Sequence, residues 1–551
     1  MRKKSDFIKN TAILFGAMFI TKIIGAVLKI PLTNMIGGKG MGFFSSAYSF
    51  FTPVYTVLAA GLPTIVTKMT AQCIALKKYR EARSVKASAI ALSVAGGIVG
   101  TAFIFALAVP FVNYAAASPE SLYSVYAIAP SILFCCMASA YRGYYEGLYN
   151  MFPTAVSQVL ESVVKAVMGL GLSGIVLSLG ERGAVPDKQT LPCAAAAAVL
   201  GVTLGEFCGT LFLVLRSRLK KDTITEDELL SSPPPRSKRK IAKDIFLQSL
   251  PISAGALIIN LSSFIDLLTI SGGVQECLAK NYGYFLSNYS EAVKEAGADS
   301  FGNFVYGSYT GIVLSVFMLI SSLTALIGKS ALPAIAAEHE CGSREEVKRN
   351  VSILLSGIFV IGLPLCLSLG ALSEPVLRLL YPVRSAEVSV SVLPLSILCF
   401  GGIAVAVCGG LFSVFQAVDR SDLPIKLMMA GSALKLMLNL IFLRIPQISV
   451  CGAALSTVIS HLLVMVLGIV SLEKAIGVKV NVFPLFVKPF AASAACCFFA
   501  LLCYYLLFDN FNSILRMIFT VLGGAGVYGL LILLLDKRII LSVIKRRKVK
   551  T

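Results

Sequence analysis

The chain has 551 residues, of which 56% are hydrophobic and 14% are charged. Soluble domains carry about a quarter charged residues, so this composition excludes one soluble globular core. The net charge is +20 at pH 7, which in a soluble protein would suggest nucleic acid. Here the basic residues lie in short segments between apolar runs, so we interpret them as membrane topology and expect no nucleic-acid partner.

Apolar runs long enough to cross a bilayer recur along the chain. A transmembrane helix needs about 20 predominantly apolar residues, and about fourteen segments meet that requirement. We therefore predict an all-α polytopic membrane protein. The first apolar stretch is too long for a signal-peptide core, so we expect an uncleaved first helix. The expected spans are 11–36, 43–71, 87–112, 121–141, 153–180, 191–215, 245–271, 304–330, 351–373, 387–415, 424–443, 451–472, 484–508 and 513–535.

The positions of Lys and Arg predict the orientation. If the N-terminus is inside and the spans alternate, 32 of these residues fall in inner segments and 9 in outer segments. This bias follows the positive-inside rule and places both termini in the cytoplasm. It also places the proline-rich, basic segment 216–244 inside and the polar segment 272–303 outside.

The two halves of the chain resemble each other. Leu62-Pro63 and Leu332-Pro333 are 270 residues apart, and Pro153 and Pro424, each before a helix that carries a lysine, are 271 apart. A repeated bundle with a central site is typical of transporters. We predict an N-lobe of six helices over 1–215, a cytoplasmic linker over 216–244, a C-lobe of six helices over 245–472, and two further helices with a basic cytoplasmic tail over 473–551.

Motifs for enzymatic chemistry are missing from the sequence. The 14 cysteines lie mainly inside apolar runs, and the two histidines, His339 and His461, are far apart, so we expect no metal site and treat His461 as a packing residue. No phosphate-binding Gly-x-x-x-x-Gly-Lys-Ser/Thr motif occurs, so we expect no ATP hydrolysis by this chain. We predict a protein that is not an enzyme and needs no cofactor.

Ionisable residues inside the expected spans are the candidates for function. A lysine at the centre of a span costs roughly 2.5–3.5 kcal/mol, so such residues need a reason to be there. Lys22 and Lys29 are seven residues apart and share a face, with Gly25 between them. Among these candidates there is no excess of acidic residues: the acidic ones are Glu161, Glu206 and Asp266, and the basic ones are Lys22, Lys29, Lys165 and Lys435. This balance favours an anionic substrate, because a site for cationic drugs should be dominated by acidic and aromatic groups.

Structural explanations remain open for several of these residues. Lys68 and Lys329 lie near inner helix ends, where their side chains could extend to the interface. Glu161 and Lys165 are four residues apart and could form a pair within one helix. Asp266 could pair with a lysine of the first helix or bind a coupling cation.

Several stretches resemble the stage V sporulation protein B family, which belongs with the lipid II flippases to the multidrug/oligosaccharidyl-lipid/polysaccharide exporter superfamily. The similarity covers nearly the whole chain. The family pattern often has Arg where this chain has Lys22 or Lys165; lysine keeps the positive charge but cannot bind a phosphate in the bidentate geometry of arginine. The stretches that carry it are Lys22–Gly25, Ala60–Lys68, Gly143–Gln158, Leu160-Glu161, Val305–Gly307 and Leu326–Pro333.

The resemblance implies a flippase in the bacterial cytoplasmic membrane that moves a polyprenyl-pyrophosphate-linked oligosaccharide, first of all lipid II, by alternating access. We expect Lys22, Lys29 and Lys165 to hold the pyrophosphate, and the resemblance implies that the last two helices offer a groove for the lipid tail. Membrane lipids and the cell-wall synthesis machinery are the expected partners, and an ion gradient, the membrane potential or downstream consumption would drive transport. The candidate substrate-binding residues are Lys22, Gly25, Lys29, Lys68, Gln158, Glu161, Lys165, Asp266, Lys329 and Lys435.

Three alternatives to lipid II transport stay open from the sequence. The first is a flippase for another polyprenyl-linked polysaccharide of a capsule or spore layer. The second is a cation-coupled multidrug exporter, and the third is a non-transporting scaffold for envelope assembly.

Overall fold

The computed structural model describes residues 2–219, 224–477, 479–507 and 512–535, and side chains in that part except those of 2–15, 26, 326, 329, 333 and 535. The described residues are almost entirely helical and contain no strand, which confirms the all-α prediction. Within them, 13 helical segments are long and apolar enough to cross a membrane. The chain is therefore a multi-pass membrane protein. The basic tail over 536–551 lies outside the described residues.

The chain divides into two compact units. Unit 1 comprises residues 1–275 and 296–311, and unit 2 comprises 276–295 and 312–551. Unit 1 therefore takes in α9 almost completely and α12, which the internal repeat assigned to the second lobe; the lobe boundaries themselves stay a prediction. The elements of unit 1 are α1 (Arg2–Ala59), α2 (Leu62–Ala75), α3 (Tyr79–Pro110), η1 (Phe111–Ala115), η2 (Pro119–Ser121), α4 (Leu122–Ile128), α5 (Ser131–Gly147), α6 (Phe152–Glu181), α7 (Asp187–Leu219), α8 (Glu226–Leu230), α9 (Lys238–Lys280), η3 (Ala298–Ser300) and α12 (Phe301–Ser308).

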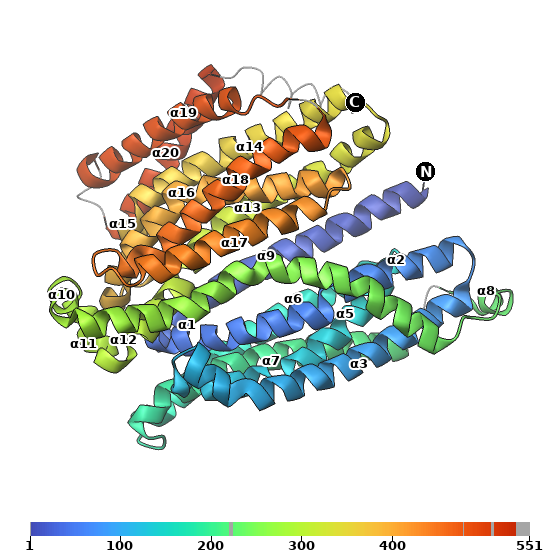
Figure 1. Ribbon diagram of the computed structural model, residues 1–551, viewed down its shortest axis with the longest axis horizontal. Helices are drawn as coiled ribbons and strands as arrows, with labels where there is room; N and C mark the ends of the chain where they lie inside the picture. The colour runs from blue at the N-terminus through green and yellow to red at the C-terminus, as the bar shows by residue number, and fades with distance from the viewer. Residues whose placement is uncertain (1, 220–223, 478, 508–511, 536–551) are drawn as a thin grey trace. The chain divides into compact units, whose positions relative to one another are not determined.

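Unit 2 is built from the remaining helices. Within it, α14 packs against α16 and α19, α16 packs against α18, and α19 packs against α20 (Figure 1). Its elements are α10 (Tyr282–Asn288), α11 (Ser290–Ala296), α13 (Leu314–Glu340), α14 (Arg344–Ala371), α15 (Ser373–Leu380), α16 (Ser385–Ala417), α17 (Asp422–Phe442), η5 (Ser449–Cys451), α18 (Gly452–Ile476), α19 (Phe483–Leu502), η6 (Cys503–Leu507) and α20 (Ser513–Leu535), with η4 (Tyr309–Val313) at the boundary of the two units.

Helix α1 contains a break where two separate spans were expected. Gly37 has φ 64° and ψ −174°, a backbone conformation that residues with a side chain rarely adopt. The predicted span 11–36 ends at this break, and the predicted span 43–71 continues through the rest of α1 into α2. Gly37 thus ends the first segment of α1, which carries Lys22 and Lys29.

The part of α1 after the break is fastened to α12. Asn303 donates a hydrogen bond from Nδ2 to the carbonyl of Lys39 at 3.1 Å, and the hydroxyls of Ser49 and Tyr306 are 2.9 Å apart. Thr310, directly after α12, donates to the Ser45 hydroxyl at 2.8 Å. These polar contacts hold the middle of α1 in place inside unit 1.

Helices α6 and α7 form the most extensive helix pair of unit 1 (Figure 1). Gly201, Gly205 and Gly209 of α7 recur every four residues and therefore lie on one face, which is turned to α6. A Cβ atom at Gly205 would lie 2.7 Å from the Glu161 carbonyl oxygen, and one at Gly209 would lie 3.1 Å from that of Ser157. Small residues let membrane helices approach this closely, so these glycines set the spacing of the pair.

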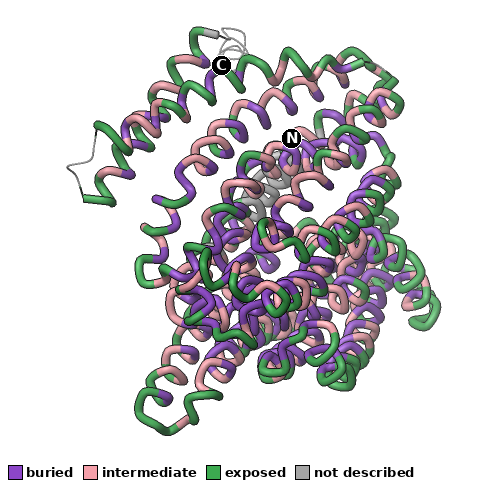
Figure 2. The backbone as a smooth tube through the Cα atoms, turned by 60° about the vertical axis from the view of Figure 1, so that its left-hand side comes forward, coloured by how far each residue is buried: buried purple, intermediate pink, exposed green. Residues whose placement is uncertain are grey.

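Burial is distributed as expected for helices that face both protein and lipid. Figure 2 shows buried and exposed residues alternating along individual helices. Many of the exposed residues are large and apolar; Val99 of α3 and Leu534 of α20 are each 65% exposed. Apolar side chains in such positions are stable against hydrocarbon, which agrees with the membrane assignment.

The described part of the predicted linker is attached to unit 1. Arg236 bonds Glu81 at 2.5 Å through Nε and Asp244 at 3.0 Å through Nη1, and Arg80 donates from Nε to the Leu229 carbonyl at 2.8 Å. Side-chain hydrogen bonding to the buried Glu81 carboxylate raises the pKa of Arg236. The linker therefore has defined anchor points against α3 and α9.

The predicted orientation can be tested with cysteine labelling in a background that lacks the 14 native cysteines. Leu230 in the linker and Leu286 in α10 are 74% and 39% exposed, so both are suited to substitution by cysteine. Because the charge bias places 216–244 inside and 272–303 outside, an impermeant reagent should label Leu286→Cys in intact cells and Leu230→Cys only after lysis. Labelling of Leu230→Cys in intact cells would contradict the orientation.

Close packing of α6 and α7 predicts different effects for two glycine substitutions. Gly205→Ala places a methyl group against the Glu161 carbonyl, so the helices must separate, at a cost of about 1–3 kcal/mol. Gly171→Ala in α6 is the control, because a Cβ atom there meets nothing within 4 Å. Thermal unfolding in detergent should show a lower Tm for Gly205→Ala and an unchanged or higher Tm for Gly171→Ala. Equal Tm values for the two variants would show that the glycine face does not set the spacing.

Candidate functional site: a charged cluster inside unit 1

Charged side chains from four helices meet inside unit 1. Arg142 of α5 and Glu161 of α6 form an ion pair with 2.7 Å between Nη2 and Oε2, and their side chains are only 17% and 20% exposed. Arg142 also donates from Nε to the Ser157 hydroxyl at 3.1 Å, and that hydroxyl donates to the Thr154 carbonyl at 2.9 Å. The guanidinium is thus held on the first turns of α6 by two side chains.

Lys165 lies one turn further along α6 and takes a different partner. Its Nζ atom is 4.9 Å from the centroid of the Tyr48 ring of α1. A cation at this distance from an aromatic face is attracted by the ring, and more strongly where water is excluded. Lys29 of α1 is close enough to Lys165 for the two charges to repel each other. An anion that bound between Lys29 and Lys165 would relieve that repulsion.

Glu206 of α7 completes the cluster. It interacts electrostatically with Glu161 and Arg142, and it lies beside the glycines that bring α7 against α6. The cluster therefore contains three basic residues, Lys29, Arg142 and Lys165, and two acidic ones. Its formal charge balance is positive when all five groups are ionised. Such an arrangement in a low-dielectric site can bind an anion through charge-assisted hydrogen bonds.

Gln158 adds a polar group to the same face of α6. It precedes Glu161 by three residues and Lys165 by seven, so the three side chains follow one side of the helix. Its amide oxygen is buried and has no hydrogen-bond partner among the described residues. Buried polar atoms usually have a partner, so this oxygen is available to a hydroxyl or amide donor of a ligand.

The other predicted site residues lie in different surroundings. Lys22 is exposed on α1, and Gly25 is half-buried with open space around it. Lys68 is exposed on α2, which fits the interface explanation as well as a binding role. Asp266 of α9 is 4% exposed and lies near Tyr306 of α12. The side chain of Lys329 lies outside the described part of the chain.

Lys435 belongs to unit 2 and is described there. It is 2% exposed in α17 and lies near His461 of α18, whose Nδ1 is 2.9 Å from the Thr457 carbonyl. The structure brings together Lys29, Glu161 and Lys165 from the predicted set, with Gln158 on the same face of α6 as the last two. The assignment of all ten residues to substrate binding stays a prediction.

Arg142 belongs to the charged cluster but is not among the predicted site residues. It lies between the expected spans 121–141 and 153–180, and the structure continues α5 to Gly147, so that Arg142 belongs to this helix. Glu161 correspondingly forms its ion pair with Arg142 of α5, whereas the sequence offered Lys165 of its own helix as the partner. Arg142 lies just beyond an expected span, and its burial becomes visible only through its ion pair with Glu161 on another helix.

The ion pair predicts a non-additive result for charge removal. Removing one partner of a buried pair leaves an uncompensated charge and costs about 3–5 kcal/mol, while removing both avoids that penalty. Arg142→Gln and Glu161→Gln should each lower the Tm of the purified protein, and the double variant should recover most of the loss. The control is Arg349→Gln, which removes an exposed partner of Glu346 and should have little effect. Additive losses in the double variant would contradict the pairing.

Comparisons with known proteins identify the family. The polysaccharide biosynthesis protein model matches residues 7–292, and the lipid II flippase MurJ model matches residues 303–524. Stage V sporulation protein B of Bacillus subtilis (strain 168) is 24% identical over 87% of this chain and 86% of its own length. Lipid II flippase MurJ of the same organism is 21% identical over 86% of this chain and 84% of its own length.

A solved structure shows the same fold. The inward closed conformation of lipid II flippase MurJ superposes with a TM-score of 0.68 at 13% identity, covering 96% of this chain and 99% of that one. The first of the two family models alone covers more than half of the chain. The sequence, the fold and these matches together show that the chain belongs to the polysaccharide biosynthesis family, with the stage V sporulation protein B-like and lipid II flippase-like proteins of the multidrug/oligosaccharidyl-lipid/polysaccharide exporter superfamily.

Proposed function

We propose that the chain is a flippase that translocates a polyprenyl-pyrophosphate-linked cell-wall precursor, with lipid II as the first candidate substrate. The observation that carries the proposal is the cluster of Lys29, Arg142 and Lys165 inside a membrane-spanning bundle. Burying these cations together is unfavourable unless anions accompany them, and Glu161 and Glu206 supply fewer charges than the three basic residues. A diphosphate supplies the missing negative charge.

The relatives support the lipid-linked class of substrate. One is named a lipid II flippase, and the family model over residues 7–292 is described by polysaccharide biosynthesis. In the proposed cycle, the diphosphate binds between Lys29 and Lys165 while Gln158 bonds the polar head. Lys22 lies seven residues before Lys29 on the same helix and would meet the substrate before or after that site. The substrate is released on the other side of the membrane when the site closes to one side and opens to the other. The membrane potential, an ion gradient or consumption of the product drives this step.

A second candidate substrate is another polyprenyl-linked polysaccharide precursor. Stage V sporulation protein B is slightly more similar to this chain than the lipid II flippase is, and the polysaccharide biosynthesis model covers the first half of this chain. Both substrates share the polyprenyl pyrophosphate and differ in the sugar. The cationic cluster therefore supports both, and the accumulated intermediate in depleted native cells distinguishes them.

Lys165 gives the sharpest test of the proposed function. A charge-assisted hydrogen bond is worth about 1.5–3 kcal/mol, so Lys165→Ala should reduce flipping by about tenfold or more. Lys165→Arg keeps the charge and should retain much of the activity. The assay is the growth of a strain depleted of its own lipid II flippase, together with the amount of lipid II accessible at the outer face. The same pair of substitutions at Lys22 tests whether that lysine belongs to the path.

Lys426→Ala is the matched control for a lost lysine. Lys426 is exposed on α17 and pairs with Asp422 at 2.9 Å, so its removal should leave growth unchanged. Protein abundance is measured for every variant. Normal growth with Lys165→Ala at normal abundance would contradict the proposed role of the cluster. If the wild-type protein does not support growth of the depleted strain, and a different lipid-linked intermediate accumulates in native cells depleted of this protein, the second substrate is favoured.

A further inference from the structure

A separate cavity lies in unit 2, where several membrane-spanning segments end. It measures about 320 Å³ and is lined by residues from the end of α13, the start of α14 and the end of α18. The corresponding spans finish at Glu340, begin at Arg344 and finish at Ile476. Lipid phosphates lie at this level of a bilayer, just beyond the apolar core. The lining residues are His339, Gly342, Arg344, Val347, Lys474, Ala475, Ile476 and Gly477.

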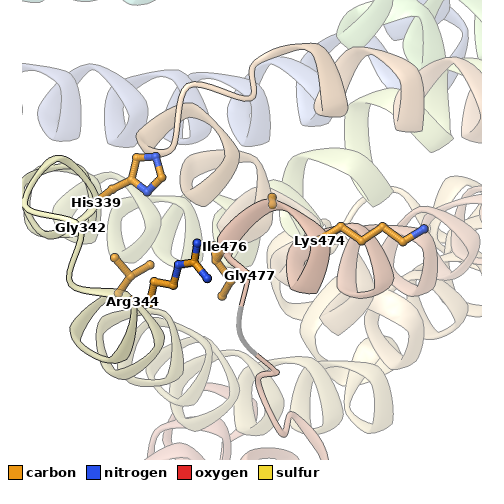
Figure 3. A pocket seen from close by; sticks show the side chains of 8 residues that line it. His339, Gly342, Arg344, Lys474, Ile476 and Gly477 are labelled. Carbon is orange, nitrogen blue, oxygen red and sulfur yellow. The ribbon is translucent and has the colours of Figure 1, made fainter.

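Basic groups dominate the polar lining of this cavity. Figure 3 shows the His339 ring and the Arg344 guanidinium turned toward Ile476 and Gly477, while the Lys474 ammonium points away. No carboxylate is among the lining residues. The two acidic residues next to Arg344 are engaged elsewhere: Glu345 pairs with Lys348 at 3.9 Å and Glu346 with Arg349 at 3.0 Å. Within the described residues, no ion pair or hydrogen bond is made by the Arg344 side chain.

Two glycines with positive φ border the cavity. Gly477 ends α18 with φ 69°, and Gly342 precedes α14 with φ 70°, conformations that favour glycine. A Cβ atom at Gly477 would lie 3.4 Å from Nη1 of Arg344, so the end of α18 lies directly beside the guanidinium. The start of α14 adds the partial positive charge of a helix N-terminus to the same place.

We propose that this cavity binds a phosphate group, and that its natural source is the head group of an anionic phospholipid. Arg344 supplies a planar, always charged donor that matches phosphate oxygens, and His339 supplies a second donor. The apolar side chains of Val347 and Ile476, both buried, border the cavity and suit the glycerol and upper acyl region of a lipid. Free inorganic phosphate shares the binding chemistry but makes no use of this apolar border.

A structural role for Arg344 is the competing explanation. The carbonyl groups at the end of α18 attract cations, so the guanidinium could act only on that helix terminus. This explanation predicts that replacing Arg344 lowers the Tm in the absence of ligand and leaves phosphate binding unchanged. The proposed site predicts that the Tm without ligand is not lowered and that phosphate binding is weakened.

The experiment uses the full-length protein in detergent micelles with three variants. Arg344→Gln and His339→Gln alter the cavity, and Arg349→Gln is the control on the same helix, because its exposed side chain pairs with Glu346. Binding of phosphatidylglycerol, phosphatidylcholine and inorganic phosphate is measured by native mass spectrometry and by the shift in Tm. Folding of each variant is checked by its Tm without ligand.

Wild-type protein should bind phosphatidylglycerol in preference to phosphatidylcholine, and Arg344→Gln should weaken that binding by about fivefold. His339→Gln should weaken it less, and Arg349→Gln should match the wild type. Arg344-dependent binding of inorganic phosphate without binding of phosphatidylglycerol would keep the phosphate site and reject the lipid as its source. Equal binding by wild type and both cavity variants, or an equal loss in Arg349→Gln, would overturn the proposal. None of these outcomes depends on the flippase activity.

Discussion

The ion pair between Arg142 and Glu161 is the interaction on which the arrangement of unit 1 depends. A charge inside a membrane protein is tolerated when a partner and further hydrogen bonds accompany it. This requirement fixes α5 against α6 with 2.7 Å between the paired atoms. Because Glu161 is paired with Arg142, the Lys165 ammonium lies over the Tyr48 ring of α1. The ion pair thus determines the partner of the neighbouring charge. Glu206 can join only because the glycine face of α7 admits that helix alongside α6.

The cluster therefore combines two physical properties that the proposed binding of an anionic head group requires. Its two acidic groups offset most of the charge of its three basic groups when no ligand is bound, which keeps the bundle stable. Its excess of basic groups and the buried Gln158 oxygen leave binding capacity for a ligand that brings negative charge and hydroxyl groups. A cluster balanced completely by acidic residues would be stable but would have little affinity for a diphosphate.

Much of this organisation could be predicted from the sequence, because lipid imposes long apolar runs and excludes strands that lack partners. The segments expected to span the membrane correspond to helices, and Lys29, Glu161 and Lys165 were selected because ionisable residues in spans are rare. Arg142 was missed because it follows an apolar run by one residue, and helix ends are uncertain by more than that. The partner of Glu161 was also undetermined, since spacing within one helix says nothing about a residue on another.

The break at Gly37 has a mechanical consequence for α1. A straight helix transmits any tilt along its whole length, whereas a single residue with φ 64° uncouples the two rods on either side of it. The rod after the break is anchored through Ser49 and Tyr306, and the rod before it carries Lys22 and Lys29. A change in the tilt of the segment before the break would therefore change the depth of Lys22 and Lys29 in the membrane without requiring the anchored segment to move.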